Sequence, residues 1–212
     1  MYYLKLGKLN VVFTARKDGN MRNFQKRKET AQNFGFTDIY IPKQKHTDII
    51  TDLENPDTVA DGVYTEKKMR PVGVLTADCM AVVMSDMERV VVVHAGWRGL
   101  LNGIVDKGLD YFTDRKDLIV FVSPHARACC YEVKEDFVDY AKRSGVSEEY
   151  FTYRDGRIYF SMSDLLIDRL KSCGIERVID VSLCTICDGE FFSYRKGDFE
   201  ERILTFSWLS ED

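Results

Sequence analysis

The sequence predicts an α+β fold in which mixed β-sheets are covered by about four helices. Two apolar runs, Val90–Val93 and Leu118–Val122, have the length of fully buried strands. A third segment, 101–112, repeats its apolar residues every three to four positions, which is typical of a helix that buries one face. Several strands follow one another too closely for helical crossovers, so we expect antiparallel pairs among them.

Strands are predicted where apolar residues cluster between turn signals. In chain order they are Asn10–Thr14, Asp38–Ile41, Asp61–Thr65, Val72–Thr76, Met80–Met84, Arg89–His94, Leu118–Val122, a hairpin within Tyr150–Phe160, Arg177–Leu183 and Arg202–Trp208. The dipeptide Asp155-Gly156 supplies the turn of the hairpin. The neighbouring strands 72–76, 80–84 and 89–94 are expected to pair antiparallel.

Helices are predicted where apolar residues recur at helical spacing and a glycine follows. They are Arg22–Phe34, the segment 101–112, Glu132–Arg143 and Asp164–Cys173. In the first of these, Phe24, Ala31 and Phe34 form the apolar stripe. No linker or internal repeat interrupts the pattern, so we expect one domain over residues 1–212.

Composition excludes several classes of protein. Of the 212 residues, 45% are hydrophobic and 30% charged, which excludes a disordered or collagen-like chain. A chain of this length buries a full core without a stabilising metal, so a bound metal is expected to be functional rather than structural. The first residues lack the apolar core of a secretion signal, and the apolar runs are far shorter than the ~18 residues of a membrane span. We therefore expect a cytoplasmic protein that contacts no membrane.

Charge is unevenly distributed along the chain. The first 28 residues hold eight Lys or Arg and a single Asp, although the net charge of the chain is −4. Such a segment could contact phosphate or nucleic acid. A solvated helix face is the simpler interpretation, and we expect no nucleic-acid partner.

The chain has only three histidines, and His94 has the most informative position. It ends the most apolar strand and begins the motif His-Ala-Gly-Trp-Arg-Gly. Gly96 and Gly99 let the backbone approach a ligand, and a helix N-terminus there would favour an anion such as phosphate. Arg98 adds a bidentate donor for that anion. The alternative is a core histidine followed by a solvated arginine.

A second polar position interrupts the apolar run from Val72 to Met84. Asp78 lies at its centre, and a buried carboxylate there needs a partner. The adjacent Cys79 could be a metal ligand, a nucleophile or a small buried side chain. Together with His94 and with His46, from a polar segment earlier in the chain, it would form a three-ligand set known for catalytic zinc. Spacing alone leaves this set open.

The other cysteines and the third histidine give weaker signals. Cys184 and Cys187 form a single CxxC, which is incidental or structural in most chains. Cys129 and Cys130 are adjacent, so their side chains are expected to diverge rather than bind one metal. His125 follows a strand end and is expected to have no special role. All six cysteines are expected to be free thiols or ligands, because cytoplasmic thiols stay reduced.

Four segments together resemble the YfiH-like family, whose members are described as polyphenol oxidase or laccase-domain proteins and as purine nucleoside phosphorylases. The segments are TADC (76–79), HAGWRG (94–99), CCYEV (129–133) and FFSYR (191–195). The resemblance covers about residues 10 to 206. The chain departs from the family at residues 44–47, where Gln-Lys-His-Thr replaces Gln-Val-His-Gly, and at 123–129, where two glycines are lost.

The resemblance implies a compact mixed-sheet αβ sandwich, related to the catalytic domain of cytotoxic necrotizing factor toxins. It also implies a zinc ion on His46, Cys79 and His94. The implied reactions are phosphorolysis of purine nucleosides (adenosine, inosine and methylthioadenosine) and deamination of adenosine by a zinc-activated water. Phosphate would bind at Gly96–Gly99 near Arg98, with Gln44 and Arg195 as further substrate contacts. Asp78 would transfer a proton or orient a ligand histidine.

Two other functions are consistent with the same residues. In a Cys-His hydrolase acting on an amide bond, such as one in a peptidoglycan precursor, Cys79 would be the nucleophile, His94 its base and Asp78 the orienting group. In a binding protein, the metal site would remain without catalysis. A true multicopper oxidase is not expected, because three histidines are too few for its copper ions.

Overall fold

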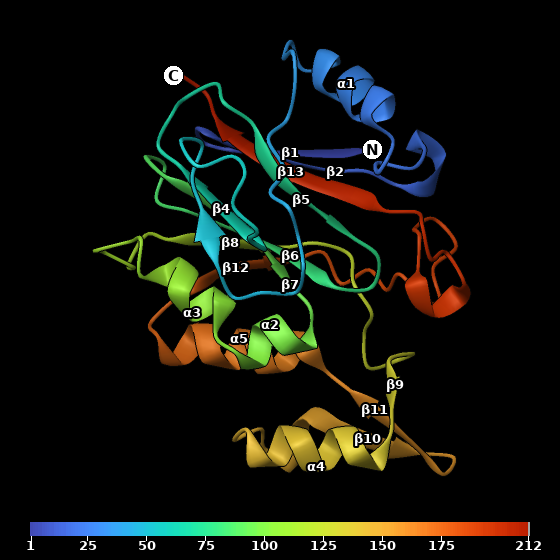
Figure 1. Cartoon of the computed structure of the whole chain (residues 1–212). Helices are drawn as coiled ribbons and strands as arrows, with labels where there is room; N and C mark the ends of the chain where they lie inside the picture. Colours follow the sequence, from blue (N-terminus) through green and yellow to red (C-terminus); the bar gives the residue numbers. More distant parts are fainter. Residues whose placement is uncertain (212) are drawn as a thin grey trace.

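The computed structural model describes residues 1–211, and it has the predicted α+β architecture. Two sheets pack face to face, and helices cover the outer face of each (Figure 1). A small annex of one helix and a three-stranded sheet lies at one end of this sandwich. The layers follow from the sequence, because strands buried on both faces need apolar neighbours on both sides.

The six-stranded sheet forms the centre of the molecule. Its strands, in spatial order, are β12 (Arg177–Asp180), β8 (Ile119–Val122), β6 (Met80–Ser85), β7 (Val90–Ala95), β4 (Gly62–Thr65) and β3 (Ile50–Thr51). The β12–β8 and β3–β4 pairs are parallel and the others antiparallel. In β7, Val91 and Val93 face the helices, whereas Val90 and Val92 face the other sheet. This two-sided burial explains the uninterrupted valine run.

The four-stranded sheet joins the two ends of the chain. Its spatial order is β1 (Tyr2–Leu6), β2 (Leu9–Phe13), β13 (Ile203–Leu209) and β5 (Val72–Thr76), and every pair is antiparallel. The expectation that 72–76 pairs with 80–84 is wrong, because β5 pairs with β13 instead. Asp78 has a positive φ of 78°, and the chain passes there from one sheet to the other. The predicted pairing of β6 with β7 is confirmed.

Helices α2 (Trp97–Leu101), α3 (Ile104–Leu109) and α5 (Met162–Ser172) cover the six-stranded sheet, and α1 (Phe24–Gln32) covers the four-stranded one (Figure 1). The single helix predicted over 101–112 is wrong: Gly103, at a φ of 81°, separates α2 from α3. Phe24 was expected in a buried stripe, yet it is 66% exposed at the first turn of α1.

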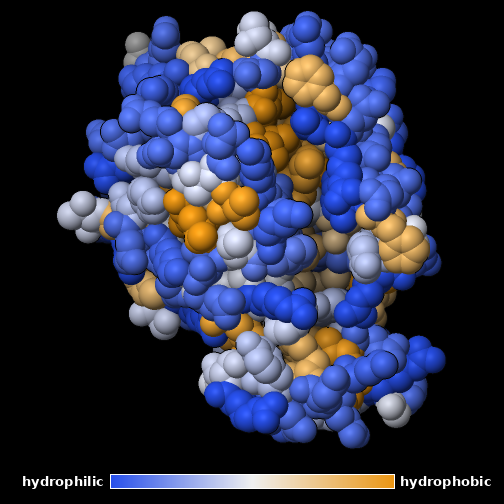
Figure 2. Space-filling view, viewed as in Figure 1, coloured by the Kyte–Doolittle hydropathy of each residue, from blue (hydrophilic) through white to orange (hydrophobic). Residues whose placement is uncertain are grey.

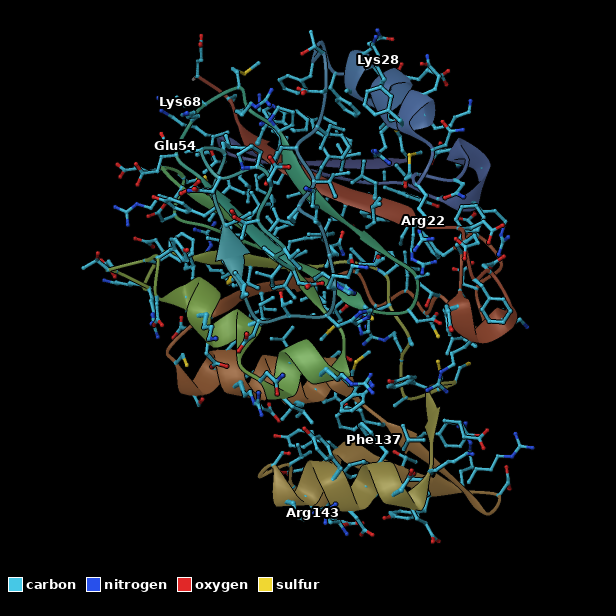
Figure 3. All side chains as sticks on the ribbon, in the orientation of Figure 1. Arg22, Lys28, Glu54, Lys68, Phe137 and Arg143 are labelled. Atoms are coloured by element: carbon cyan, nitrogen blue, oxygen red, sulfur yellow. The ribbon has the colours of Figure 1, made fainter. Side chains whose placement is uncertain are left out.

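The annex consists of α4 (Glu135–Arg143) with β9 (Glu132–Val133), β10 (Phe151–Arg154) and β11 (Arg157–Phe160). The predicted hairpin is confirmed as β10–β11, whereas the predicted helix start at Glu132 is wrong because that residue pairs in β9. The described residues also form three short 3-10 helices: Arg16–Asp18, Glu148–Tyr150 and Tyr194–Lys196. In Figure 3 the Phe137 side chain points from α4 toward the main body, where its ring meets Trp97 at 5.1 Å.

Two further details of the fold differ from expectation. The strand predicted at 38–41 is reduced to a single bridge between Tyr40 and Val72. The strand β1 was not anticipated, although its residues alternate between half-buried and exposed positions as expected for an edge strand. Among residues 1–211, no helix is long and apolar enough to cross a bilayer.

Candidate functional site

A cavity of about 570 Å³ opens where β5 passes into β6. Its size is within the usual range for small-molecule sites. The face turned toward the viewer in Figure 2 is hollowed near its middle, with apolar residues deep in the hollow and hydrophilic residues around it. The cavity is lined by the 41–46 segment, by 75–79, by the start of α2 and by the C-terminal residues Arg195 and Arg202.

The structure brings His46, Cys79 and His94 together at this cavity. One ligand atom of each lies within 4.8 Å of the others. The β6–β7 register places Ala81 opposite His94, so Cys79, just before β6, reaches the same end of the hairpin. His46 comes from the 42–47 loop and has a positive φ of 58°, which turns this loop residue toward the strands. Its ring lies 4.8 Å from that of His94.

Asp61, which the sequence analysis did not single out, holds both histidines in place. Its Oδ1 lies 2.7 Å from Nδ1 of His94. Its Oδ2 accepts the backbone N–H groups of Lys45 and Thr47, at 2.9 and 2.6 Å, on either side of His46. The residue is fully buried. The sequence did contain a signal for Asp61, because a buried carboxylate at the start of an apolar strand needs hydrogen-bond partners, as Asp78 does.

Cys79 and His94 influence the pKa values of each other. Burial alone would raise the pKa of the Cys79 thiol, but the positive charge of His94 and hydrogen bonds from both histidines lower it overall. Burial alone would lower the pKa of His94, but the Cys79 thiolate and the Asp61 carboxylate raise it overall. Because Nδ1 of His94 is engaged by Asp61, its Nε2 is the nitrogen left for a ligand.

Gly96 and Gly99 have different surroundings, although both lie in the HAGWRG motif. A Cβ on Gly96 would lie 2.8 Å from Sγ of Cys79, so only glycine leaves room for the cluster. Gly99 does not border the cavity; a Cβ there would meet the His94 carbonyl and Ile104 inside the fold. The expected phosphate contact at Gly99 therefore has no support from the cavity lining, in contrast to Gly96, which lines the cavity.

Asp78 does not contact the histidines. Its Oδ1 accepts the Thr185 hydroxyl at 2.7 Å and its Oδ2 accepts the Arg195 N–H at 2.8 Å. The expectation that Asp78 orients a ligand histidine is therefore wrong, since Asp61 makes that bond. Asp78 instead connects the Cys79 turn to the loop that carries Thr185 and to the loop that carries Arg195, and the second of these loops lines the cavity.

Four arginines line the cavity: Arg22, Arg98, Arg195 and Arg202. The guanidinium of Arg98 stacks on Trp97 at 4.1 Å and, within residues 1–211, has no ion pair or hydrogen bond. Arg195 donates to the Glu132 carbonyl at 2.7 Å and stacks on Tyr131. Sequence reasoning named Arg98 and Arg195 but missed the other two, which lie far apart along the chain.

The remaining cavity arginines and Gln44 are held by the fold. Arg22 pairs with Glu200, and in Figure 3 it lies on the side of the molecule where β13 begins. Arg202 donates to backbone carbonyls, including that of Phe199 at 3.0 Å. Gln44 pairs with the backbone of Leu75 through two bonds of 2.8 Å, so it docks its loop on β5 while lining the cavity.

The donor set and its surroundings fit a bound metal ion. Two imidazoles and one thiol are the ligand types that zinc and related ions prefer. Asp61 provides the second interaction that fixes the ring of a ligand histidine. The cavity therefore combines a group of residues that could hold a metal ion with four arginine side chains, and this combination is typical of enzymes that use a metal ion and bind an anion.

Comparisons with known proteins identify the family of the chain. Residues 5–210 match the family described as multi-copper polyphenol oxidoreductase laccase, and the chain belongs to that family. A purine nucleoside phosphorylase of Aquifex aeolicus is 36% identical over 172 residues, covering 79% of this chain and 81% of the relative. One from Clostridium acetobutylicum is 31% identical over 185 residues, covering 82% and 78%. The resemblance to YfiH-like proteins is confirmed, since the relatives include the YfiH protein of Escherichia coli.

Solved structures confirm the fold. YfiH from Bacillus licheniformis superposes with a TM-score of 0.83 at 23% identity, covering 95% of this chain and 93% of that one. YlmD from Geobacillus stearothermophilus gives a TM-score of 0.81 at 20% identity, covering 97% and 93%. The compact mixed-sheet αβ sandwich expected from the resemblance is therefore present.

Proposed function

We propose that this chain is a zinc-dependent purine nucleoside phosphorylase that also deaminates adenosine. The observation that carries the proposal is a single cavity that holds both a His-Cys-His group and four arginines. The first suits a Lewis-acidic ion and the second suits an anion. The names of the relatives support a nucleoside and phosphate as substrates. Adenosine, inosine and methylthioadenosine are the nucleosides we propose, with the cytoplasm as the compartment and neither nucleic acid nor membrane as partner.

His46, Cys79 and His94 would hold the ion at the inner end of the cavity. When bound, zinc supplies a Lewis acid that polarises a neighbouring oxygen or nitrogen. Asp61 keeps the His94 ring oriented through Nδ1 and holds the His46 loop through the adjacent amides. The chain itself therefore presents preorganised ligands, and little rearrangement is needed on metal binding.

Phosphorolysis forms a bond between a phosphate oxygen and C1′ of the sugar while the C1′–N9 bond breaks, and the purine leaves with the electron pair. Arg98 would bind the phosphate, because its side chain lines the cavity and its guanidinium has no hydrogen-bond or ion-pair partner among residues 1–211. Arg195 would contribute further positive charge from the opposite loop. Gly96 keeps the path beside Cys79 open. Asp78 borders the cavity and is our proposed group for proton transfer to the leaving purine.

The direct test is an assay of purified protein on inosine and adenosine, each with and without phosphate. We expect free base and a sugar phosphate only when phosphate is present, and inosine from adenosine in its absence. Chromatography separates all of these products. If the metal-loaded protein yields neither base nor inosine from adenosine, the proposal is wrong.

A second candidate function is a Cys-His hydrolase acting on an amide bond. The observation that favours it is the chain of contacts from Cys79 to His94 to Asp61, in which a thiolate, an imidazolium and a buried carboxylate follow one another. The intact mass of the metal-free protein incubated with an amide substrate separates the two. An acyl group retained on Cys79 supports the hydrolase, whereas its absence together with nucleoside turnover supports the phosphorylase.

A further inference from the structure

The other cluster of chemistry-bearing side chains in the described residues consists of four cysteines: Cys129, Cys130, Cys184 and Cys187. Their sulfur atoms all lie within 4.8 Å of one another. They come from two turns, one after β8 and one after β12, and these strands are parallel neighbours. Parallel strands end at the same edge of a sheet, so the two turns meet there although their cysteines are at least 54 positions apart in the chain. The expectation that adjacent cysteines diverge is wrong here, since a turn at 128–130 directs both thiols toward the CxxC.

The two turns are held next to each other by contacts that do not involve the cysteine side chains. Arg127 donates two hydrogen bonds of 2.8 Å to the Asp180 carboxylate at the end of β12. A bridge joins His125 to Cys184, with the Thr185 N–H donating to the His125 carbonyl at 3.0 Å. The sulfur positions therefore follow from a preorganised backbone.

The four cysteines differ in their exposure to solvent. Cys184 itself is only 6% exposed, whereas Cys129 and Cys187 are exposed, so an ion could enter from solvent.

From this arrangement we propose a second metal site, which takes one zinc ion on the sulfurs of Cys129, Cys130, Cys184 and Cys187. Four thiolates in a compact group match the closed tetrahedral coordination of structural zinc, and metal binding displaces the thiol protons. With all four positions taken by protein sulfur, the ion has no place for water or substrate. The site is therefore structural, in contrast to the expectation that any metal in this chain is functional.

The position of this site gives it a role in shaping the cavity. The first turn leads directly into Tyr131, and the second carries Thr185, which donates to Asp78. Tyr131 lines the neighbouring cavity and stacks against Arg195, whereas Thr185 is connected to the cavity through Asp78, which also lines it. An ion that joins the two turns therefore fixes one wall of the cavity, while the His46, Cys79 and His94 group remains a separate site. The proposal does not depend on the reaction proposed above.

Metal analysis of protein purified in reducing buffer without added metal, combined with native mass spectrometry, tests the assignment. We expect about two zinc ions per wild-type chain, one in Cys187→Ser, and one in Cys79→Ala, which removes a ligand of the other group. Cys173→Ser is the matched control, because this cysteine lies outside both groups, and it should keep both ions. Equal zinc content in Cys187→Ser and in the wild type would overturn the proposal.

A second measurement needs no variant and remains decisive if Cys187→Ser does not fold. Native wild-type protein is alkylated with iodoacetamide before and after treatment with a chelator, and each cysteine peptide is quantified. We expect Cys129 and Cys187, although exposed, to be protected until the chelator is added. Immediate alkylation of both would overturn the site. A disulfide between them, whose sulfurs lie 3.7 Å apart, or iron with visible absorption would overturn the assignment of zinc.

Discussion

Asp61 and His94 are joined by a 2.7 Å hydrogen bond between a fully buried carboxylate and the ring Nδ1. The same carboxylate accepts the two backbone N–H groups on either side of His46. One side chain thus sets both the ring direction of one histidine and the loop position of the other. Its own pKa is lowered, because hydrogen bonds from His94 and the two amides outweigh the opposing effect of burial.

This relationship predicts that Asp61→Asn weakens metal binding. An amide group presents N–H where the Lys45 and Thr47 amides or the His94 ring need an acceptor, so the two histidines lose their fixed positions. Loss of such a supporting contact lowers metal affinity by about 10- to 100-fold. Competition with a chromophoric chelator measures the affinity. Asp139→Asn is the matched control, because Asp139 is an exposed residue of α4 that does not line the cavity; an equal loss in both variants would contradict the role of Asp61.

Gly96→Ala is expected to damage the same cluster by steric means. The added Cβ would lie 2.8 Å from Sγ of Cys79, which is closer than ordinary packing allows. Overpacking of this kind costs about 1–3 kcal/mol, which we expect to appear as weaker metal binding, as lower stability, or as both. Chelator competition and thermal unfolding measure the two effects. At Gly189, where a Cβ meets no atom within 4 Å, alanine should change neither quantity.

Arg98→Ala is expected to reduce phosphorolysis more than deamination. Phosphorolysis needs a bound anion, whereas deamination needs no phosphate. A bidentate charged contact contributes roughly 1.5–3 kcal/mol, so the rate at subsaturating phosphate should fall by ~10- to 150-fold. The two rates are compared on adenosine in the same preparation. Arg143→Ala, at the end of α4 and far from the cavity residue Arg22 in Figure 3, should leave both unchanged; equal losses of both activities in Arg98→Ala would place Arg98 in another role.

We predict that the chain is not a multicopper oxidase, despite the description of its family. It has three histidines, of which His46 and His94 belong to one group. The ring of His125 is buried and bonds to the Ser123 carbonyl. The other described group consists of cysteines alone. A multinuclear copper centre needs more imidazoles than this. Metal content and the absorption spectrum of protein from copper-poor cultures check this; several coppers per chain with an intense blue band would contradict it.

Local features of the sequence were sufficient for most elements. The run Val90–Val93 is buried on both faces, and its strand was predicted because continuous apolar residues of that length have few other uses. The hairpin at Asp155-Gly156 followed from turn chemistry. The split at Gly103 was missed, because apolar spacing continues through the break between α2 and α3. The helix predicted from Glu132 begins only at Glu135, because Glu132 lies in β9 and pairs with the distant strand β11.

The family, the sheet-forming segments and the chemically active side chains of Cys79, His94 and Arg98 can be recognised from the sequence alone. Which of these side chains meet depends on the tertiary structure. It gave His94 the partner Asp61 rather than Asp78, and it placed two separate cysteine pairs in one cluster. Periodicity and turn signals depend on residues that are neighbours in the chain. The side-chain hydrogen bonds and ligand sets of the site depend instead on strand pairing between segments that are far apart in the chain.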